Sequence, residues 1–457
     1  MKRTLAELAR ACGGRLEGAD RAYSGVSTDT RTLQSGEVFV ALQGPRFNGR
    51  DFVTAAQAAG AAAAVVPSLE PVPLAQILVA DTQAALARAA AAWRAQFAIP
   101  VVGVAGSNGK TTVKEMTASI LAQQGACLAT RGNLNNHIGV PLTLFRLEAE
   151  HRYAVIEMGA NRAGDVAELL AIARPSVGLI TNAGAEHLEG FGTLEGVARA
   201  EGEMVAGLTP EGTAVINADD AFAALWRSST PARVVSFGLE QPADFTAREV
   251  RADVDADGFR TRFTLVAPLG RAAIELRLAG RHNISNALGA AAAAAAAGAG
   301  LAAIGAGLAA MRAVQGRLQL KRARSGAWLL DDSYNANPSS VRAGIEVLSG
   351  LQGRKWLVLG DMAELGSFEH QAHVEMGEFA RERGIERLFA TGKLAALAAE
   401  SFGAGGQWYP DAETLGRALD AQADGEVCIL IKGSRVNRLE RIVAALVVAA
   451  DAPRSVS

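Results

Sequence analysis

The chain has 457 residues, of which 49% are apolar and 20% charged. A single hydrophobic core stops growing at roughly 250–300 residues, so we expect two or three domains. The formal net charge of −2 excludes an overall basic field that would recruit nucleic acid or a membrane surface. In chain order, the predicted elements fall into three α/β regions.

Residues 1–80 predict a small α/β domain. The stretch "MKRTLAELARACGG" has the spacing of an amphipathic helix that ends at glycines, and "EVFVAL" (Glu37–Leu42) is typical of a buried strand. A second helix, "DFVTAAQAAG", precedes two apolar segments, "AAAAVV" and "AQILVA".

Residues 81–314 predict a central domain. Asp81 is placed to cap the helix "DTQAALARAAAAWRAQF", which leads into the buried strand "IPVVGVAG". Helical patterns separate three more apolar strands, "YAVIEMG", "VGLITNAG" and "TAVINAD", which predicts a parallel sheet with helices on both faces. We interpret residues 232–278 as short alternating strands in an antiparallel extension, and Ala-rich helices from Asn283 to about Val314 as the end of this domain.

Residues 315–457 predict another α/β unit. Its strands are "AWLLDDSY", "KWLVLGDM", "RLFATG" and "EVCILIKGS", and its last helix is "RVNRLERIVAALVVAA". The expected fold class is therefore α/β in three domains. A small N-terminal domain precedes a central P-loop ATPase-like domain with a mostly parallel sheet, and a Rossmann-like C-terminal domain follows.

The three cysteines, Cys12, Cys127 and Cys428, show no metal or disulfide spacing, which favours a reducing compartment. No apolar run approaches the roughly 20 residues needed to span a bilayer, and the start of the chain has no signal-peptide core. We therefore expect a cytoplasmic protein, and nothing in the sequence suggests more than a monomer.

The stretch "GVAGSNGKTT" (Gly103 to Thr112) lies between a predicted strand and a predicted helix. It departs from the standard phosphate loop G-x-x-x-x-G-K-[ST], because Val104 stands where the first glycine is expected. Its context still suits an anion, since glycines let N–H groups turn inward and the helix N-terminus adds a favourable dipole. Lys110 would reach the outer phosphates and the Thr111 hydroxyl would bind Mg²⁺. The alternative is a Gly-rich turn with an incidental lysine.

Further polar residues follow the ends of predicted strands or begin helices. Glu157 could hold Mg²⁺ beside the phosphates, although a solvated strand-end acid has the same pattern. His187 follows the next strand, but a lone histidine is more often structural. Asn283 and Asn286 share one helix face and suit the edge of a purine, with helix capping by Asn283 as the alternative.

The C-terminal region offers weaker signals in "LLDDSYNANPSS" and "IKGS". Asp332 could bond a ribose hydroxyl at the end of its strand. Asn335 and Asn337 could meet a small polar substrate in the turn that follows. Lys432 stands at the end of another strand.

Taken together, these stretches resemble the Mur ligase family of ATP-dependent amide-bond ligases, which build peptidoglycan precursors. The resemblance covers essentially the whole chain, and the family's loop is G-x-x-G-x-x-G-K-[ST], so the shifted glycines match it. The segments that carry the resemblance are "GSNGKTT", "NLNNHIGVPLT", "EMGAN", "TNAGAEHLEGFG", "GRHNISNALGA", "DDSYNANP" and "GDMAELG". The last two are the more typical of the member that joins D-Ala-D-Ala to UDP-N-acetylmuramoyl-tripeptide.

The resemblance implies ATP and two Mg²⁺ ions in the central domain, the UDP-sugar tripeptide on the N-terminal domain, and D-Ala-D-Ala brought by the C-terminal domain. Thr111 and Glu157 would serve one Mg²⁺ and His187 the second. The implied ATP-binding residues are Gly106, Ser107, Asn108, Gly109, Lys110, Thr111, Thr112, Asn283, Asn286, Arg317 and Asp332. The implied substrate-binding residues are Ser27, Thr28, Asp29, Arg31, Asn48, Asn335, Asn337 and Lys432.

One segment departs from the family. Many members carry a lysine in an A-K-x-E segment, and carbamylation of that lysine supplies a carboxylate beside the metal. Here the segment is "ARAEGEM" (Ala198–Met204), with Glu201 at the lysine position. Our hypothesis is that Glu201 replaces the carbamate, directly or through a water, and joins Lys110, Glu157 and His187 as a catalytic residue. The alternative is that Glu201 is an ordinary helix residue.

Three competing functions remain open at this point. A folylpolyglutamate synthase belongs to the same superfamily but lacks the N-terminal domain predicted before residue 81. A P-loop kinase or GTPase would not need "DDSYNANP". A catalytically inactive scaffold would not need Lys110, Glu157 and His187.

Overall fold

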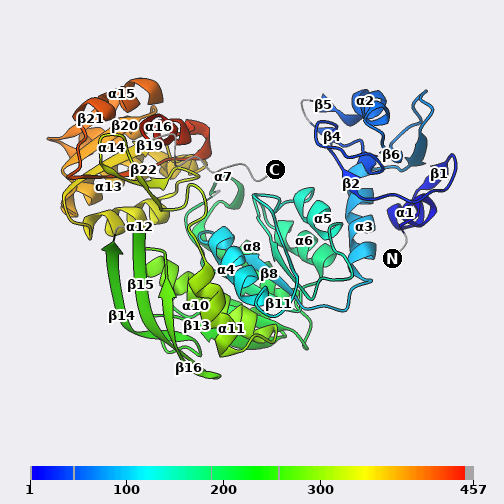
Figure 1. The fold of residues 1–457 in the computed structure, drawn as a ribbon, viewed down its shortest axis with the longest axis horizontal. Helices are drawn as coiled ribbons and strands as arrows, with labels where there is room; N and C mark the ends of the chain where they lie inside the picture. The colour runs from blue at the N-terminus through cyan, green and yellow to red at the C-terminus, as the bar shows by residue number, and fades with distance from the viewer. Residues whose placement is uncertain (1–2, 45–46, 187, 256–257, 448–457) are drawn as a thin grey trace.

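The computed structural model describes residues 3–44, 47–186, 188–255 and 258–447. Figure 1 shows three lobes, with the N-terminal and C-terminal lobes on opposite sides of the central one. Each lobe contains its own β-sheet with helices packed beside it, which confirms the predicted α/β class with three domains. Among the described residues, no helix is long and apolar enough to cross a bilayer.

The N-terminal lobe begins with α1 (Leu5–Cys12), where Thr4 and Glu7 form a reciprocal capping box and Gly13 ends the helix in the left-handed conformation. The helix covers a five-stranded sheet of order β1-β7-β6-β3-β2. A small hairpin, η1 and α2 complete the lobe. Its strands and remaining helices are β1 (Arg15–Glu17), β2 (Val26–Ser27), β3 (Val38–Val40), β4 (Gln43–Gly44), β5 (Phe47–Asn48), η1 (Gly49–Phe52), α2 (Val53–Ala58), β6 (Ala63–Val66) and β7 (Ala75–Leu78).

The central lobe is reached through α3 (Thr82–Arg94), which Asp81 caps by accepting the N–H groups of Gln83 and Ala84, as predicted. Its main sheet has six strands in the order β13-β12-β11-β8-β10-β9, all parallel. The strands are β8 (Val101–Ala105), β9 (Cys127–Ala129), β10 (Tyr153–Glu157), β11 (Val177–Ile180), β12 (Thr213–Asn217) and β13 (Arg233–Phe237). The helices are α4 (Lys110–Leu121), α5 (Gly139–Leu144), α6 (Asp165–Ala173), α7 (Leu188–Phe191), α8 (Leu194–Ala206), α9 (Ala223–Ser229), α10 (Arg281–Ala296) and α11 (Leu301–Ala310).

The prediction for residues 232–278 was partly wrong. The first strand there, β13, pairs in parallel with β12 because α9 forms a crossover between them. The antiparallel part is a separate sheet of three strands rather than an extension, and two of its strands are 10 residues long instead of short. A strong local alternation cannot reveal which sheet a strand joins. The three strands are β14 (Thr246–Asp255), β15 (Gly258–Ala267) and β16 (Gly270–Leu276).

The C-terminal lobe has a six-stranded sheet of order β17-β18-β22-β19-β20-β21, in which only β17 is antiparallel to its neighbour. The predicted last helix was too long, because Arg438 adopts a left-handed conformation (φ 51°) between η3 (Arg435–Asn437) and α16 (Glu440–Leu446). The strands are β17 (Gln319–Arg322), β18 (Trp328–Asp332), β19 (Arg354–Gly360), β20 (Arg387–Thr391), β21 (Gly406–Tyr409) and β22 (Val427–Lys432). The other helices are α12 (Pro338–Ser349), η2 (Gly366–Phe368), α13 (Glu369–Glu382), α14 (Ala395–Phe402) and α15 (Ala412–Gln422).

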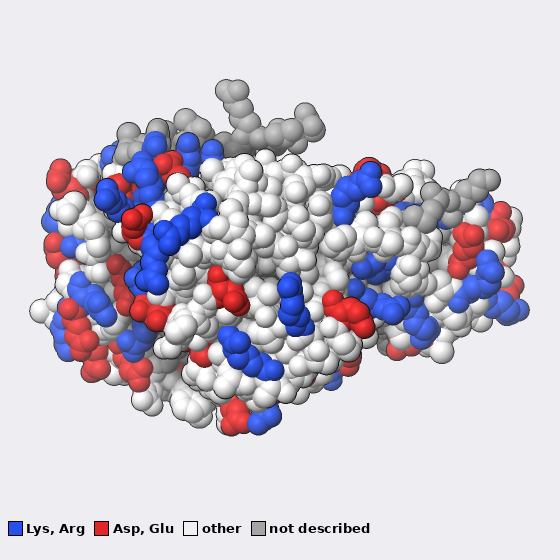
Figure 2. All heavy atoms as spheres, turned by 90° about the horizontal axis from the view of Figure 1, so that it is seen from below, with Lys and Arg blue, Asp and Glu red and all other residues white. Residues whose placement is uncertain are grey.

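The strand order brings distant residues to one edge of the central sheet. Strand β8 lies between β10 and β11, with Glu157 opposite Val104 and Ile180 opposite Ala105. The loops that follow these three strands therefore emerge side by side, at the carboxyl edge where open α/β sheets bind ligands. Figure 2, which views the molecule from below, shows charges of both signs interspersed around a broad uncharged area.

Helix α11 packs closely against α4, the helix that begins at the phosphate loop. A Cβ atom added at Gly307 would lie 2.4 Å from Cα and 2.6 Å from N of Ile120. The Ser119 hydroxyl also donates to the Gly307 carbonyl at 2.7 Å. Neither backbone can yield locally, so this contact requires glycine.

The close contact predicts opposite effects for two glycines of α11. Gly307→Ala should destabilise the central domain by about 1–3 kcal/mol, because overpacking forces the two helices apart. Gly305→Ala is the matched control, since an added Cβ there meets nothing within 4 Å and alanine is the better helix former. Scanning calorimetry should show a lower Tm only for Gly307→Ala, and equal Tm values for the two variants would contradict the packing argument.

Candidate active site

Two glycines give the loop after β8 its shape. Gly106 has φ 118° and Gly109 has φ 82°, both in the region that disfavours other residues. A Cβ at Gly106 would lie 2.2 Å from the Thr181 hydroxyl oxygen, and one at Gly109 would lie 2.4 Å from Asn286 Oδ1. The glycine spacing therefore follows from the neighbours of this loop.

Protein groups hold the first part of the loop. The Gly106 N–H donates to Glu201 Oε2 at 2.6 Å, and the Ser107 N–H donates to the Asn182 carbonyl at 2.8 Å. The Asn108 N–H donates to Asn182 Oδ1 at 3.0 Å. The first-turn N–H groups of α4 have no acceptor within the helix, so an anion would bind at this helix N-terminus, beside Lys110.

Lys110 lies among loop carbonyls and carboxylates. Its Nζ is 2.5 Å from the Gly106 carbonyl oxygen, 3.1 Å from that of Ser107 and 3.3 Å from Glu186 Oε1. Burial by itself would lower the pKa of Lys110. The surrounding carboxylates outweigh burial and raise that pKa; in order of effect they are Glu186, Glu201 and Glu157. Lys110 therefore stays charged, as binding a phosphate requires.

Two buried carboxylates near Lys110 have incompletely satisfied oxygens. Glu201 is 0% exposed, and burial raises its pKa to about 7 although Lys110 opposes the shift. Glu157 is 2% exposed and accepts a hydrogen bond from Asn135 Nδ2 at 2.8 Å. Glu157 Oε2, Glu201 Oε1 and the Thr181 hydroxyl are buried without a hydrogen-bond partner among the described residues. Such orphaned oxygens are expected where a ligand or ion binds.

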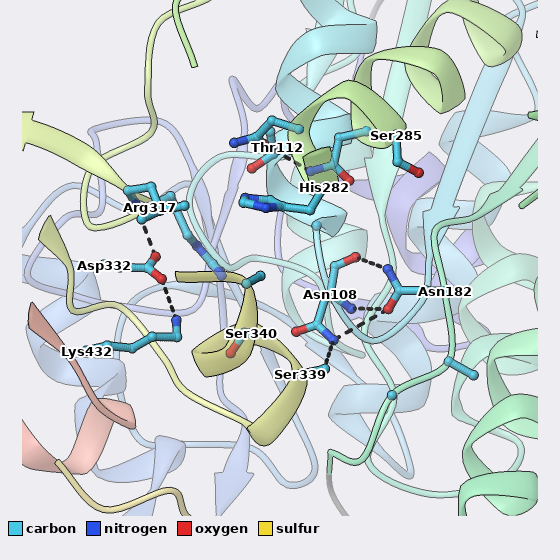
Figure 3. A pocket seen from close by; sticks show the side chains of 17 residues that line it. Asn108, Thr112, Asn182, His282, Ser285, Arg317, Asp332, Ser339, Ser340 and Lys432 are labelled. Atoms are coloured by element: carbon cyan, nitrogen blue, oxygen red, sulfur yellow. Dashed lines mark hydrogen bonds and ion pairs between the residues drawn. The ribbon is translucent and has the colours of Figure 1, made fainter. Parts of the chain in front are cut away.

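A cavity of about 340 Å³ lies between the central and C-terminal lobes, beside the loop (Figure 3). The central lobe contributes Asn283 and Asn286 near the start of α10, joined by a 3.1 Å hydrogen bond. His282 points into the same cavity, and desolvation lowers its pKa to about 4. Neutral imidazole and amide groups suit a neutral heterocycle.

The C-terminal lobe contributes charged groups to the opposite wall of this cavity. Lys432 Nζ donates to Asp332 Oδ2 at 2.6 Å, and the Leu318 N–H donates to Asp332 Oδ1 at 3.2 Å. Burial lowers the pKa of Lys432, although Asp332 opposes that shift. The Arg317 guanidinium lies over the Tyr334 ring, 4.2 Å from its centroid. The cavity therefore has polar groups from two lobes and could enclose a nucleotide.

Three family models match consecutive parts of the chain: the Mur ligase family catalytic domain over residues 22–94, the Mur ligase middle domain over 104–294, and the Mur ligase glutamate ligase domain over 316–435. The curated UDP-N-acetylmuramoyl-tripeptide–D-alanyl-D-alanine ligase of Escherichia coli K12 is 45% identical over 97% of this chain and 98% of its own length.

The chain belongs to the Mur ligase family. Solved structures agree with this assignment. MurF from Acinetobacter baumannii superposes with a TM-score of 0.90 at 35% identity, covering 97% of this chain and 98% of that one. MurF from Thermotoga maritima, solved in complex with ADP, has a TM-score of 0.79 at 27% identity, covering 92% and 96%.

The structure of this Mur ligase brings many of the predicted residues together. The carboxylates of Glu157 and Glu201 both act on the charge of Lys110. Lys110 and Glu201 also form hydrogen bonds to the backbone of the loop. Asn108, Gly109, Thr112, Asn283, Asn286, Arg317, Asp332 and Lys432 line the adjacent cavity. Gly106, Ser107 and Thr111 belong to the same loop and helix start. His187 lies outside the described residues.

Other predicted residues lie elsewhere or already have partners. Asp29 and Arg31 form an exposed ion pair, and hydrogen bonds from Arg31 lower the pKa of Asp29 to about 2. Ser27 bonds locally to Asp29, and Thr28 belongs to the same turn. Asn48 caps η1 and lines a cavity of about 810 Å³ between the N-terminal and central lobes. Asn335 is exposed, whereas Asn337 caps α12. Their roles in binding substrate stay predictions.

Sequence reasoning missed three residues of this site. Glu186 pairs with Lys110, Asn182 holds the loop, and His282 lines the cavity. Each stands within a segment that was quoted from the sequence. Glu186 and His282 adjoin residues that were selected there, and Asn182 follows the end of β11. A search for every polar residue in those segments would have found them.

The carboxylates fit Mg²⁺ better than a metal that needs a complete protein cage. No group of three or more His, Cys, Asp or Glu side chains in the described ranges is arranged to hold a metal ion. Mg²⁺ usually binds through one or two carboxylates plus substrate phosphates. The unpartnered oxygens of Glu157 and Glu201 would supply such oxygen ligands.

The lowered pKa of His282 predicts a pH effect on stability. In the unfolded chain this histidine has a pKa of 6.5, whereas in the folded chain its pKa is about 4. Between these values protons bind mainly to the unfolded chain, so the free energy of unfolding falls as the pH falls through this window. His282→Gln should therefore lose less Tm between pH 7 and pH 5 than the wild type does. His370→Gln is the control because that side chain is 70% exposed. Identical acid slopes for wild type and His282→Gln would refute the assignment.

Proposed function

We propose that the chain is the ligase that joins D-Ala-D-Ala to UDP-N-acetylmuramoyl-tripeptide, giving the pentapeptide, ADP and phosphate in peptidoglycan precursor synthesis. The observation that carries this proposal is the 45% identity, over nearly the full length of both chains, to the E. coli ligase of that specificity. The A. baumannii MurF fold and the Lys110 site support it. Coverage of 98% of the E. coli ligase includes the N-terminal domain that a folylpolyglutamate synthase lacks, and disfavours that alternative.

The proposed ATP site is the cavity beside the loop. The phosphates would meet the N-terminus of α4, where the first-turn N–H groups and Lys110 supply positive charge. The base and ribose would lie between the amides of α10 and the Asp332–Lys432 pair. The ADP bound to the T. maritima relative supports a nucleotide in this family, and the position assigned here is our proposal.

The first proposed step is phosphoryl transfer. An oxygen of the tripeptide's terminal carboxylate forms a bond to the γ-phosphorus as the bond to the β-phosphate oxygen breaks, which gives an acyl phosphate and ADP. Two anions must approach each other, and Lys110 reduces that repulsion because its ammonium stays charged. In the structure Lys110 contacts loop carbonyls, so these contacts and the γ-phosphate would compete for its three protons.

The second step forms the amide. The amine of D-Ala-D-Ala attacks the acyl carbon, the tetrahedral intermediate loses phosphate, and a proton leaves the nitrogen. We propose that the C-terminal lobe brings the dipeptide and that Asn335, Asn337 and Lys432 contact it; of these three, Lys432 lines the cavity. The N-terminal lobe would hold the UDP end through Ser27, Thr28, Asp29, Arg31 and Asn48. Enclosure between lobes would exclude water from the acyl phosphate.

We propose Mg²⁺ as the metal, with Thr111 and Glu157 at one ion and His187 and Glu201 at a second. Bound Mg²⁺ would neutralise charge on the transferring phosphoryl group. The unpartnered oxygens of Glu157 and Glu201 support this proposal for those two residues. For His187, and for the number of ions, the support is the sequence motif alone.

The proposed activity predicts dipeptide-dependent ADP release. Purified protein with ATP, Mg²⁺ and UDP-N-acetylmuramoyl-tripeptide should release ADP continuously only when D-Ala-D-Ala is added, because the amine consumes the acyl phosphate. Lys110→Ala should lower the rate by about 10³-fold through loss of charge at the transition state. A coupled ADP assay measures both. ADP release at the same rate with and without the dipeptide would favour the kinase or GTPase alternative.

The Glu201 hypothesis predicts that the wild type is active without added bicarbonate and that a variant lacking the Glu201 carboxylate is less active. Glu201→Gln keeps an acceptor for the Gly106 N–H but loses the negative charge, so kcat should fall by about 10- to 100-fold. The matched control is Glu203→Gln on the same helix, because Glu203 bonds to the N–H groups of Gly164 and Ala167 instead. Strong stimulation of the wild type by bicarbonate would contradict the hypothesis.

A further inference from the structure

The side chain of Asn108, in the middle of the phosphate loop, contacts the C-terminal lobe directly. Asn337 Nδ2 donates to Asn108 Oδ1 at 2.8 Å, and Asn108 Nδ2 donates to the Ser339 hydroxyl oxygen at 3.0 Å. The Ser339 hydroxyl in turn donates to Asn337 Oδ1 at 3.0 Å. These three hydrogen bonds form a closed ring in which every side chain both donates and accepts. We call this group the Asn108–Asn337–Ser339 ring.

The ring is anchored firmly on the central lobe. Asn182 accepts the Asn108 N–H at 3.0 Å and donates through Nδ2 to the Asn108 carbonyl at 3.0 Å, so it holds both backbone groups of that residue (Figure 3). Gly184 leaves room for the ring, since a Cβ there would lie 2.9 Å from Asn108 Nδ2 and 3.2 Å from the Ser339 hydroxyl oxygen. Hydrogen bonds therefore tie the loop backbone directly to the ring.

The ring is anchored equally firmly on the C-terminal lobe. Asn337 is 6% exposed and is the N-cap of α12, where its Oδ1 also accepts the Ser340 N–H at 2.9 Å. The carbonyl just before this cap, that of Ala336, accepts the Ser434 hydroxyl at 3.2 Å, and the Asn335 carbonyl accepts Lys432 Nζ at 3.0 Å. Lys432 is the residue that holds Asp332. The ring thus connects the loop to the Asp332–Lys432 wall of the cavity.

We propose that Asn108 is a positioning residue that sets the approach of the C-terminal lobe to the phosphate loop. Its side-chain amide bonds to the C-terminal lobe, while the N–H groups at the start of α4 would face the phosphates. Through the ring, the position of the loop fixes where Asp332 and Lys432 stand across the cavity, and so couples nucleotide binding to the arrangement of the two lobes. The nucleotide part of this inference rests on the proposed function; the bridge between lobes does not.

The ring makes a prediction about shape that needs no substrate. Asn108→Ala and Ser339→Ala should each increase the radius of gyration measured by small-angle X-ray scattering, because each removes two of the three bonds across and within the ring. The double variant should match Asn108→Ala alone, since residues in one network are not additive. Ser340→Ala is the matched control, because it weakens the α12 cap through the Asn337 N–H and leaves the ring intact. It should lower Tm without changing the scattering profile.

The same variants test the coupling to nucleotide. Loss of about 0.5–1.5 kcal/mol of hydrogen bonding corresponds to an approximately 2- to 12-fold weaker affinity for a non-hydrolysable ATP analogue, measured by titration calorimetry with Mg²⁺. KM for ATP should rise by a similar factor in Ser339→Ala, with a smaller change in kcat for a saturated enzyme.

Three outcomes distinguish the possibilities. Ser339→Ala with wild-type scattering and wild-type affinity would overturn the proposal. Weaker nucleotide binding in Asn108→Ala but not in Ser339→Ala would assign Asn108 to phosphate contact, and would also overturn it. If the wild type shows no ATP turnover, the proposed function fails, while an increased radius of gyration in both variants would still establish the bridge.

Discussion

The half-buried ammonium of Lys110 is the charge on which the rest of the site depends. Three carboxylates surround it, those of Glu157, Glu186 and Glu201, and the cluster carries excess negative charge whenever all three are ionised. Burial raises the pKa of Glu201 to about 7, although the charge of Lys110 opposes that shift. Because Glu201 also accepts the Gly106 N–H, the charge state of the cluster and the shape of the phosphate loop are linked. A cation bound at the unpartnered oxygens would complete this balance.

Hydrogen bonds between protein groups hold the opposite wall of the cavity in place. Asp332 accepts hydrogen bonds from Lys432 and from the Leu318 N–H, so both of its oxygens are directed by protein groups. These partners come from β22 and from the segment that enters the C-terminal lobe. A carboxylate fixed in this way loses little conformational freedom when it meets a ligand. The Asn108–Asn337–Ser339 ring connects this wall to the phosphate loop by hydrogen bonds.

The sequence alone predicted those parts of the site that depend on one segment or on strand ends. The loop, Lys110, Glu157 and the two asparagines of α10 were selected because strand, loop and helix signals agreed locally, and because the carboxyl ends of parallel strands share one edge; the structure brings them together, and their roles stay predictions. The pair Asp332–Lys432 was recognised only as two separate strand ends. Their contact depends on β18 lying beside β22, across 100 residues of chain. The placement of β13 failed for the same reason, since sheet membership is decided by topology rather than by local pattern.

Glu201 shows why a departure from a family pattern needs structure to interpret. A glutamate on an exposed helix face would be unremarkable, but this one is fully buried, directed at the loop by the Gly106 N–H, and left with one unpartnered oxygen. Burying a carboxylate without full hydrogen bonding costs stability, and a cation or ligand bound at the free oxygen would offset that cost. A carbamylated lysine would supply a similar charge on a longer stem and would require carbon dioxide. A glutamate in this role would remove that requirement on a shorter stem, and in the structure this glutamate accepts the Gly106 N–H at 2.6 Å.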